Sequence, residues 1–191
     1  MLNVSPRQRP YETLPGLNPL GIPAVAPLPT GESADTQRLA ERFGADILAA
    51  GLHHGQQVVY VKPSQLVALA EFAKNDPQLQ YEALVDVSAV DQAELPIAGD
   101  ASRFQTVYQL RSYARKQHLM VVCPADESGG ADAPVAPSLA GVHKGAIWPE
   151  REVWDLMGVR FAGHPDHRRI LMPDHWPNHP LQKQVPVGGE E

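Results

Sequence analysis

The stretch RFQTVYQLRSYARKQHLMVVCP, residues 103–124, decides which fold we expect for this chain. Its first half places Phe104, Val107 and Leu110 among polar neighbours, as in a strand with one buried face. Its second half, residues 117–124, is a nearly continuous apolar run, which is typical of a central strand. The letters ARK between the two halves predict a turn. The stretch therefore predicts a hairpin of two antiparallel strands.

Two further strands and a helix precede this hairpin. Residues 56–62 are rich in β-branched and aromatic side chains, which favours a strand, and residues 81–91 alternate in part and predict another. Between them, apolar side chains recur at helical spacing. We therefore expect an amphipathic helix with Ser64 as its N-cap and Pro77 at its end.

A first helix is expected near residue 34. Ser33 or Asp35 can cap it, apolar side chains as far as Ile47 share one face, and Gly51 or Gly55 is expected to end it. The order is then helix, strand, helix, three strands and helical pieces. That order predicts an α+β fold, with a mixed and largely antiparallel sheet flanked by helices.

Three parts are expected along the chain. Residues 1–33 contain seven prolines, which exclude a helix or a sheet interior. This part should be a Pro-rich N-terminal arm that is flexible or lies on a partner. Residues 34–145 should form the α+β core domain. Residues 146–191 should hold a short helix followed by an extended C-terminal docking segment.

Composition argues against several classes of protein. A formal charge of −6 and a pI near 5.7 argue against nucleic acid as a partner. The single cysteine, Cys123, excludes an internal disulfide and a Cys-rich metal site, and its apolar surroundings predict a buried, unreactive thiol. No apolar run approaches the ~20 residues that span a bilayer. We expect a soluble, intracellular protein that reaches a membrane only through a partner.

Acidic residues, arginines, histidines and tryptophans are concentrated in residues 150–181, EREVWDLMGVRFAGHPDHRRILMPDHWPNHPL. Pro149 suits the first turn of a helix and Gly158 suits its stop, so the stretch should open with a short helix. In a helical projection, Glu150 falls in the middle of the apolar arc. The residues on the opposite face are Arg151, Glu152 and Asp155.

A carboxylate on an apolar face must find a cationic or hydrogen-bonding partner, or be protonated. Arg168 and Arg169 are the expected partners of Glu150. Arg151 and Asp155 are four residues apart and could form an ion pair on the outer face of the helix.

Four histidines follow the helix, namely His164, His167, His175 and His179. Their spacing resembles a paired metal-binding pattern, but four prolines interrupt the segment and deny the imidazoles a shared helical framework. The alternative is a surface that binds another protein. Trp176, Arg168 and Arg169 are residue types that are favoured at such interfaces.

The stretch 150–181 resembles the signature of the 30-kDa subunit, also called the C subunit, of respiratory complex I. The shared pattern runs ERE, D, G, F-x-GHP, an arginine pair, IL, P-D and a closing HPL. Upstream, residues 81–91 and 103–113 resemble the central strands of that family. The chain departs from the pattern at Asn178, Gln182 and Gln184, where the family commonly has a glycine and a basic–acidic run.

The resemblance implies a non-catalytic structural subunit in the peripheral arm of a proton-translocating NADH–quinone oxidoreductase, at the cytoplasmic face of the cell membrane. It implies docking on the hydrogenase-like large subunit that helps to form the quinone site. FMN, iron–sulfur clusters, NADH and quinone would then be bound by other subunits, and this chain would carry no catalytic, cofactor-binding or metal-binding residue. The residues expected at the subunit interface or in the motif are Glu150, Arg151, Glu152, Asp155, His164, Arg168, Arg169, Trp176 and His179.

Two alternatives remain open on the sequence. The chain could be the equivalent scaffold subunit of a related membrane-bound hydrogenase or dehydrogenase, because nothing in it binds the electron donor. It could also be a stand-alone protein that binds a metal through its C-terminal histidines.

Overall fold

The computed structural model describes residues 31–93, 102–127 and 134–186. Within these ranges the α-helices are α1 (Ala34–Phe43), α2 (Leu66–Asn75) and α3 (Ile147–Met157), and the strands are β1 (Ile47–His53), β2 (Gln56–Val61), β3 (Ala83–Asp91), β4 (Phe104–Ser112), β5 (Gln117–Pro124), β6 (Val135–Pro137) and β7 (Arg160–Ala162). None of these helices is long and apolar enough to cross a membrane. Most of the predicted Pro-rich arm, residues 1–30, lies outside the described residues.

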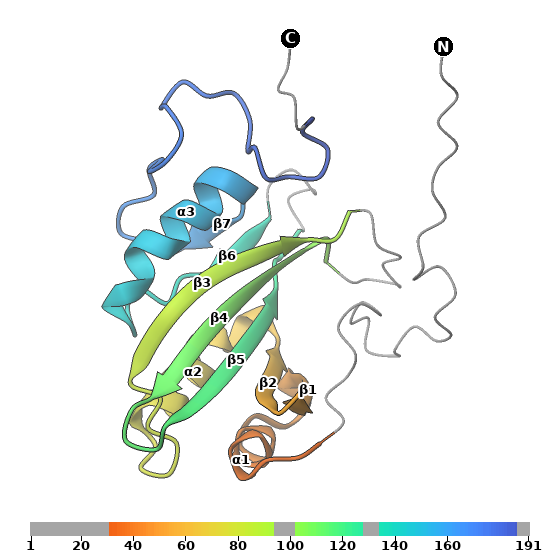
Figure 1. Ribbon diagram of the computed structural model, residues 1–191, viewed down its shortest axis with the longest axis vertical. Coiled ribbons are helices and arrows are strands. Elements are labelled where there is room, and N and C mark those ends of the chain that lie inside the picture. The colour runs from red at the N-terminus through yellow and green to blue at the C-terminus, as the bar shows by residue number, and fades with distance from the viewer. Residues whose placement is uncertain (1–30, 94–101, 128–133, 187–191) are drawn as a thin grey trace, which may run out of the picture.

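Five strands form one sheet in the order β1-β2-β5-β4-β3, and β6 pairs with β7 in a separate parallel sheet. Neighbours in the large sheet are antiparallel except β2 and β5, which run parallel. The hairpin predicted from residues 103–124 is confirmed, since β4 and β5 pair from Gln105 with Pro124 to Ser112 with Gln117. The predicted α+β class with a mixed, largely antiparallel sheet is therefore confirmed (Figure 1).

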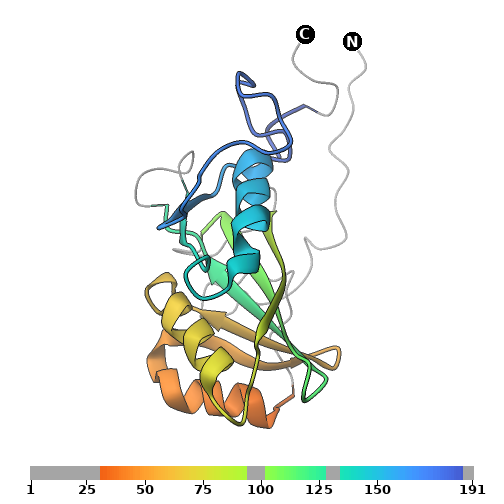
Figure 2. The ribbon, with the colours of Figure 1, turned by 90° about the vertical axis from the view of Figure 1, so that its left-hand side faces the viewer.

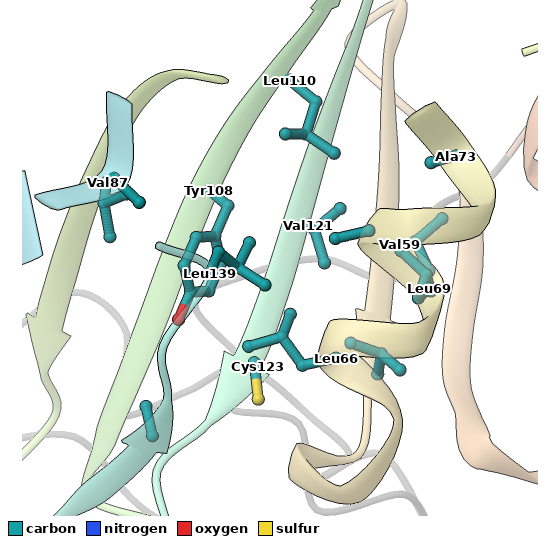
Figure 3. Packing of buried hydrophobic residues seen from close by; sticks show 14 of the residues in the cluster. Val59, Leu66, Leu69, Ala73, Val87, Tyr108, Leu110, Val121, Cys123 and Leu139 are labelled. Atoms are coloured by element: carbon teal, nitrogen blue, oxygen red, sulfur yellow. The ribbon is translucent and has the colours of Figure 1, made fainter. Parts of the chain in front are cut away.

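All three helices contribute to a hydrophobic core on one face of the large sheet. The core joins apolar side chains of α1, α2 and α3 to the inward-facing side chains of the strands. In Figure 3, Val59 of β2 and Val121 of β5 face α2. Cys123 lies in the same core, as predicted, and burial raises the pKa of its thiol to about 12. Figure 2 shows α1 and α2 on one side of the sheet and α3 beside β3.

The first helix ends earlier than the sequence predicts, and a strand follows it. Ser33 caps α1 as predicted, in a reciprocal capping box. The helix stops at Gly44, whose φ of +54° favours glycine, and not at Gly51 or Gly55. Ile47 begins β1, because antiparallel pairing with β2 overrides the helix-like composition of this segment.

The start of α2 also differs from the prediction. Ser64 lies in a 3₁₀ turn, Pro63–Gln65, and Gln65 occupies the N-cap position without a side-chain hydrogen bond. The predicted cap at Ser64 is therefore wrong, because the 3₁₀ turn continues directly into the helix. The other end agrees with the sequence: α2 stops at Asn75, two residues before Pro77.

Candidate docking site

Helix α3 carries most of the predicted site residues, and local sequence sets its ends. A 3₁₀ turn, Lys144–Ala146, leads into it, and Gly158 ends it with a φ of +80°, in the left-handed region. Val153 and Met157 enter the main core. Beyond β7 runs the C-terminal loop, which we define as residues 163–186 and which contains no helix or strand.

Asp155 is fully buried and holds the C-terminal loop against α3. Its Oδ2 accepts the backbone N–H groups of Ile170 (3.0 Å), Leu171 (2.7 Å) and Met172 (2.8 Å). Its Oδ1 accepts a hydrogen bond of 2.6 Å from Arg169. Burial alone would raise the pKa of Asp155, but the three backbone donors and the guanidinium outweigh burial and lower this pKa to about 2. The carboxylate is therefore ionised and acts as a fixed anchor for one turn of the loop.

Two arginines complete this attachment. Arg151 donates to the carbonyl oxygens of Arg168 (3.0 Å) and Arg169 (2.8 Å), and Arg169 donates to those of Trp176 (2.8 Å) and Asn178 (3.2 Å). The predicted ion pair between Arg151 and Asp155 on an outer face is wrong. Both side chains are buried, because the C-terminal loop covers that side of α3.

The loop returns to α3 (Figure 1). The N–H of Leu181 donates to Leu156 O (2.9 Å), and Gln182 Nε2 donates to Met157 O (2.9 Å). At Gly158 the two segments are so close that an added Cβ would lie 2.6 Å from Gln182 Nε2. Gln182, a departure from the family pattern, thus caps the carbonyl end of α3.

The end of the loop is attached to the large sheet. The N–H of Lys183 donates to Asp91 Oδ2 at the end of β3 (2.8 Å). Arg103 pairs with the same carboxylate (2.6 Å) and donates to Gln184. The loop is therefore held at α3 and at the sheet. Sequence reasoning missed the attachments to the sheet, which join residues that are more than 80 positions apart.

Glu150 occupies a different environment at the start of α3. It is fully buried in the apolar arc, as the helical projection predicted. Its oxygens accept hydrogen bonds from Ser138 Oγ (2.6 Å) and from the N–H of Leu139 (2.7 Å). Burial raises the pKa of Glu150 to about 7, against the lowering effect of these two donors.

The predicted pairing of Glu150 with Arg168 or Arg169 is wrong. Arg168 is exposed and pairs with Asp166 (2.6 Å), and Arg169 belongs to Asp155. Nε2 of His164 lies 4.0 Å from Oε2 of Glu150. Ser138 gave no signal in the sequence, because it precedes Glu150 by twelve positions and lies in an irregular segment before α3.

Three of the four histidines hydrogen-bond to the backbone. His164 Nδ1 accepts the N–H of Asp166 (3.0 Å), which leaves its Nε2 to donate to Ile147 O (2.9 Å). His167 Nε2 accepts the N–H of Phe161 (3.1 Å), and burial lowers the pKa of His167 to about 4. His179 Nδ1 lies 2.9 Å from Asp155 O. Within the described ranges, no three His, Cys, Asp or Glu side chains are grouped so that they could hold a metal ion.

The outer surface of this region carries large apolar side chains. Four are exposed on α3 and the C-terminal loop: Trp148 (63%), Leu171 (59%), Trp176 (39%) and Leu181 (56%). Of the predicted site residues, Glu152, Arg168 and Trp176 also reach solvent, whereas Glu150, Arg151 and Asp155 are buried. The region can therefore bind a surface through its exposed apolar groups, while its buried charges fix the shape.

Comparison with known sequences assigns the family. The sequence model described as "Respiratory-chain NADH dehydrogenase, 30 Kd subunit" matches residues 59–191. The C subunit of NADH-quinone oxidoreductase from Roseiflexus sp. (strain RS-1) is 37% identical over 155 residues, which cover 81% of this chain and 84% of the relative. The protein of the same name from Trichlorobacter lovleyi is 41% identical over 160 residues, which cover 82% of this chain and 93% of the relative.

Solved structures share the fold. A trypsin-resistant fragment of Nqo5 superposes with a TM-score of 0.55 at 23% identity and covers 69% of this chain and 98% of the fragment. A chain of the membrane-bound sulfane sulfur reductase, an archaeal respiratory membrane complex, gives a TM-score of 0.56 at 18% identity and covers 79% of this chain and 83% of that chain. At these identities the likeness shows the fold alone. The family model and the sequence relatives establish that the chain belongs to the family of the 30-kDa subunit of respiratory-chain NADH dehydrogenase.

Proposed function

We propose that the chain is a non-catalytic structural subunit in the peripheral arm of a proton-translocating NADH–quinone oxidoreductase. It docks on the hydrogenase-like large subunit near the quinone site, at the cytoplasmic face of the membrane. FMN, the iron–sulfur clusters, NADH and quinone are bound by other subunits of the complex. The family assignment supports membership in the complex, and the geometry of α3 and the C-terminal loop supports the structural role.

One observation carries the docking role: the C-terminal loop is held in shape before any partner binds. Asp155, Arg151 and Arg169 fix its backbone through hydrogen bonds, and the exposed tryptophans lie on this fixed frame. A segment that is already ordered loses less conformational entropy on binding, so more of the contact energy appears as affinity. Exposed tryptophan is also among the residue types that contribute most at protein interfaces.

The predicted interface residues divide into two groups under this proposal. Glu152, Arg168 and Trp176 would contact the partner. The residues that would position the loop are Glu150, Arg151, Asp155, His164, Arg169 and His179. The second group is largely buried in the free chain, so its contribution to assembly would act through the shape of the loop.

A second candidate is the equivalent scaffold subunit of a related membrane-bound hydrogenase or dehydrogenase. The shared fold with a chain of the sulfane sulfur reductase complex favours keeping it. The two candidates share the docking mode and differ in the electron donor. The identity of the subunits that co-purify with the chain separates them, because recovery of a subunit that binds NADH and FMN would favour the first candidate.

Affinity purification of the tagged chain from mild-detergent extracts tests the proposal. The peripheral subunits should co-purify, and the double variant Trp148→Ala, Trp176→Ala should recover several-fold less of the large subunit. Tyr113→Ala is the control, since Tyr113 is about as exposed as Trp148 but lies at the β4–β5 turn. Recovery of the chain without other subunits, or equal losses in both variants, would contradict the proposal. Metal analysis of the same preparation tests the histidine alternative, which requires one tightly bound metal ion per chain.

A further inference from the structure

The start of α3 and the start of the C-terminal loop bring two titratable side chains together in the interior. The side chains of Glu150 and His164 are both fully buried, and Glu150 Oε2 lies 4.0 Å from His164 Nε2. This distance is longer than a hydrogen bond, so the two groups are neighbours that do not bond to each other. Each is held by other partners, and each therefore has an alternative partner about 1 Å beyond hydrogen-bond reach.

In its neutral form, His164 carries its ring proton on the nitrogen that is close to Glu150. Its Nδ1 accepts the N–H of Asp166 (3.0 Å), so the proton lies on Nε2 and is donated to Ile147 O (2.9 Å). Ile147 is the first residue of α3, and the carbonyl at this position also accepts a helical N–H from four residues later. The carbonyl therefore keeps a donor when the imidazole turns away from it.

Glu150 has room for a further donor. A carboxylate can accept about four hydrogen bonds, whereas Glu150 accepts two, from Ser138 Oγ and from the N–H of Leu139. Among the residues that the structure describes, no lysine or arginine forms an ion pair with it. The titratable side chain near it on β4 is Tyr108, which is neutral because burial and, after burial, Cys123 and Glu150 raise its pKa.

We propose that Glu150 and His164 form a proton-controlled latch between α3 and the C-terminal loop. While Glu150 is protonated, His164 donates to Ile147 O; once Glu150 has released its proton to solvent, His164 donates to Glu150 Oε2 instead. Hydrogen bonds to an ionised acceptor are roughly twice as strong as those between neutral groups, so the carboxylate outcompetes the carbonyl. The imidazole moves by about 1 Å to reach a normal hydrogen-bond distance.

The charged and titratable groups around His164 keep their state near neutral pH. Asp166 pairs with Arg168 (2.6 Å) and lies 3.6 Å from Arg151. The hydrogen bond from Arg168 lowers the pKa of Asp166, which is therefore ionised. The ring of His167 lies 5.6 Å from that of His164, and burial lowers the pKa of His167 to about 4, so His167 is neutral.

The latch couples the protonation of Glu150 to the shape of the C-terminal loop. Burial raises the pKa of Glu150 to about 7, so both arrangements occur near neutral pH. When the imidazole moves, it shifts the turn that the N–H of Asp166 closes, and with it the paired Arg168. Arg168 is one of the exposed side chains assigned to the docking surface, so an effect on a partner rests on the proposed function. The latch itself is a property of the free chain.

Nuclear magnetic resonance of the free full-length chain, from about pH 5.5 to 8.5, tests the latch. The ¹³C shift of the Ile147 carbonyl should change as the imidazole leaves it, with a midpoint near 7, and the side-chain carboxyl of Glu150 should titrate with the same midpoint. In Glu150→Gln, which cannot ionise, the Ile147 signal should stay constant. Glu152→Gln, on the exposed face of the same helix, is the matched control and should keep the transition.

Three results would overturn the latch. The first is an Ile147 signal that does not change with pH in the natural chain, and the second is a change that persists in Glu150→Gln. The third is protonation of both ring nitrogens of His164 over the same range, since the imidazole and not Glu150 would then titrate. The two midpoints are compared in the natural chain, so this arm does not depend on a variant that folds. No partner is present, so failed co-purification of other subunits would leave the latch standing.

Discussion

The two ends of α3 each bury a carboxylate completely, yet the two carboxylates have opposite properties. At the C-terminal end, Asp155 receives three backbone N–H groups and an arginine, and its pKa falls to about 2. At the N-terminal end, Glu150 receives one hydroxyl and one backbone N–H, and its pKa rises to about 7. The number and charge of the donors, and not burial alone, therefore decide whether a buried carboxylate is ionised.

The two residues therefore have different structural roles. Asp155 is a charged anchor that organises the C-terminal loop, and its removal leaves three N–H groups without their acceptor and takes away the carboxylate partner of Arg169. Glu150 bridges α3 and the segment at Ser138, it is about half protonated near pH 7, and its ionisation opposes folding. Variants at the two ends of α3 should therefore differ in size and in pH dependence.

The largest effect is expected for Asp155→Ala. Removing one partner of a buried ion pair typically destabilises a protein by about 3–5 kcal/mol. We expect a loss of that order in the free energy of unfolding, measured by chemical denaturation of the purified chain. Hydrogen exchange at Ile170, Leu171 and Met172 should accelerate. Glu152→Ala, on the exposed face of the same helix, is the control. A loss no greater than in this control would mean that the anchor is not needed.

The next effect is the pH dependence that Glu150 imposes. Its pKa is about 7 in the folded chain against an ordinary value of 4.5, so the folded state retains its proton to higher pH. The contribution of Glu150 to stability should therefore fall as pH rises from 4.5 to 7 and then level off, by about 3 kcal/mol in total, against the opposite contribution of His167, whose pKa is lowered to about 4. Glu150→Gln should remove this decline. Denaturation curves at several pH values measure it, and parallel profiles for the variant and the natural chain would refute the assignment.

Asp155 gives the opposite dependence. Its pKa is lowered in the folded chain, so its contribution is complete above the ordinary value of 3.8 and is lost as pH falls toward 2. In the Asp155→Ala chain, this loss of stability as pH falls from 3.8 toward 2 should be absent. Acid titration followed by circular dichroism separates the two residues, because only the Glu150 contribution lies above pH 4.5.

A smaller effect is expected for Glu150→Ala at pH 5, where Glu150 is protonated. The change leaves the Ser138 hydroxyl and the Leu139 N–H without their buried acceptor, and an unsatisfied buried group costs about 1–3 kcal/mol. Glu152→Ala should change the free energy of unfolding by less than about 0.5 kcal/mol, because Glu152 is exposed. Equal values for the two variants would contradict the buried role of Glu150.

The smallest effect on stability is expected at the exposed surface itself. Trp176→Ala removes an exposed side chain, so the free energy of unfolding should change by about 0.5 kcal/mol or less. Recovery of partner subunits should nevertheless fall. A large loss of stability would show that Trp176 supports the loop and does not mainly contact a partner.

The sequence predicted those features that depend on local patterns. The β4–β5 hairpin, α2 and the burial of Glu150 follow from alternation and helical periodicity within single segments. The strand β1 was missed because its composition, ILAAGLH, is helix-like and only pairing with β2 makes it a strand. The strands β6 and β7 have three residues each, too few for a periodic signal.

The candidate site is built from residues that the sequence analysis named, but the connections between them were not predicted. A helical projection describes one helix and contains nothing about what covers it. It therefore placed Asp155 on an outer face, where the C-terminal loop in fact lies. The family resemblance pointed to residues 150–181, but Ser138, the partner of Glu150, lies outside them and is brought there by tertiary packing that no local pattern records.

The most direct test of the central claim compares two exposed apolar residues of similar size. Leu171 lies on the anchored loop and is 59% exposed, and Val85 lies on β3 and is 55% exposed. Leu171→Asp and Val85→Asp should both fold, as denaturation of the free chains can verify. Recovery of the large subunit with the tagged chain should fall several-fold for Leu171→Asp and stay near the natural level for Val85→Asp. Equal recovery in both variants would contradict a docking surface formed by α3 and the C-terminal loop.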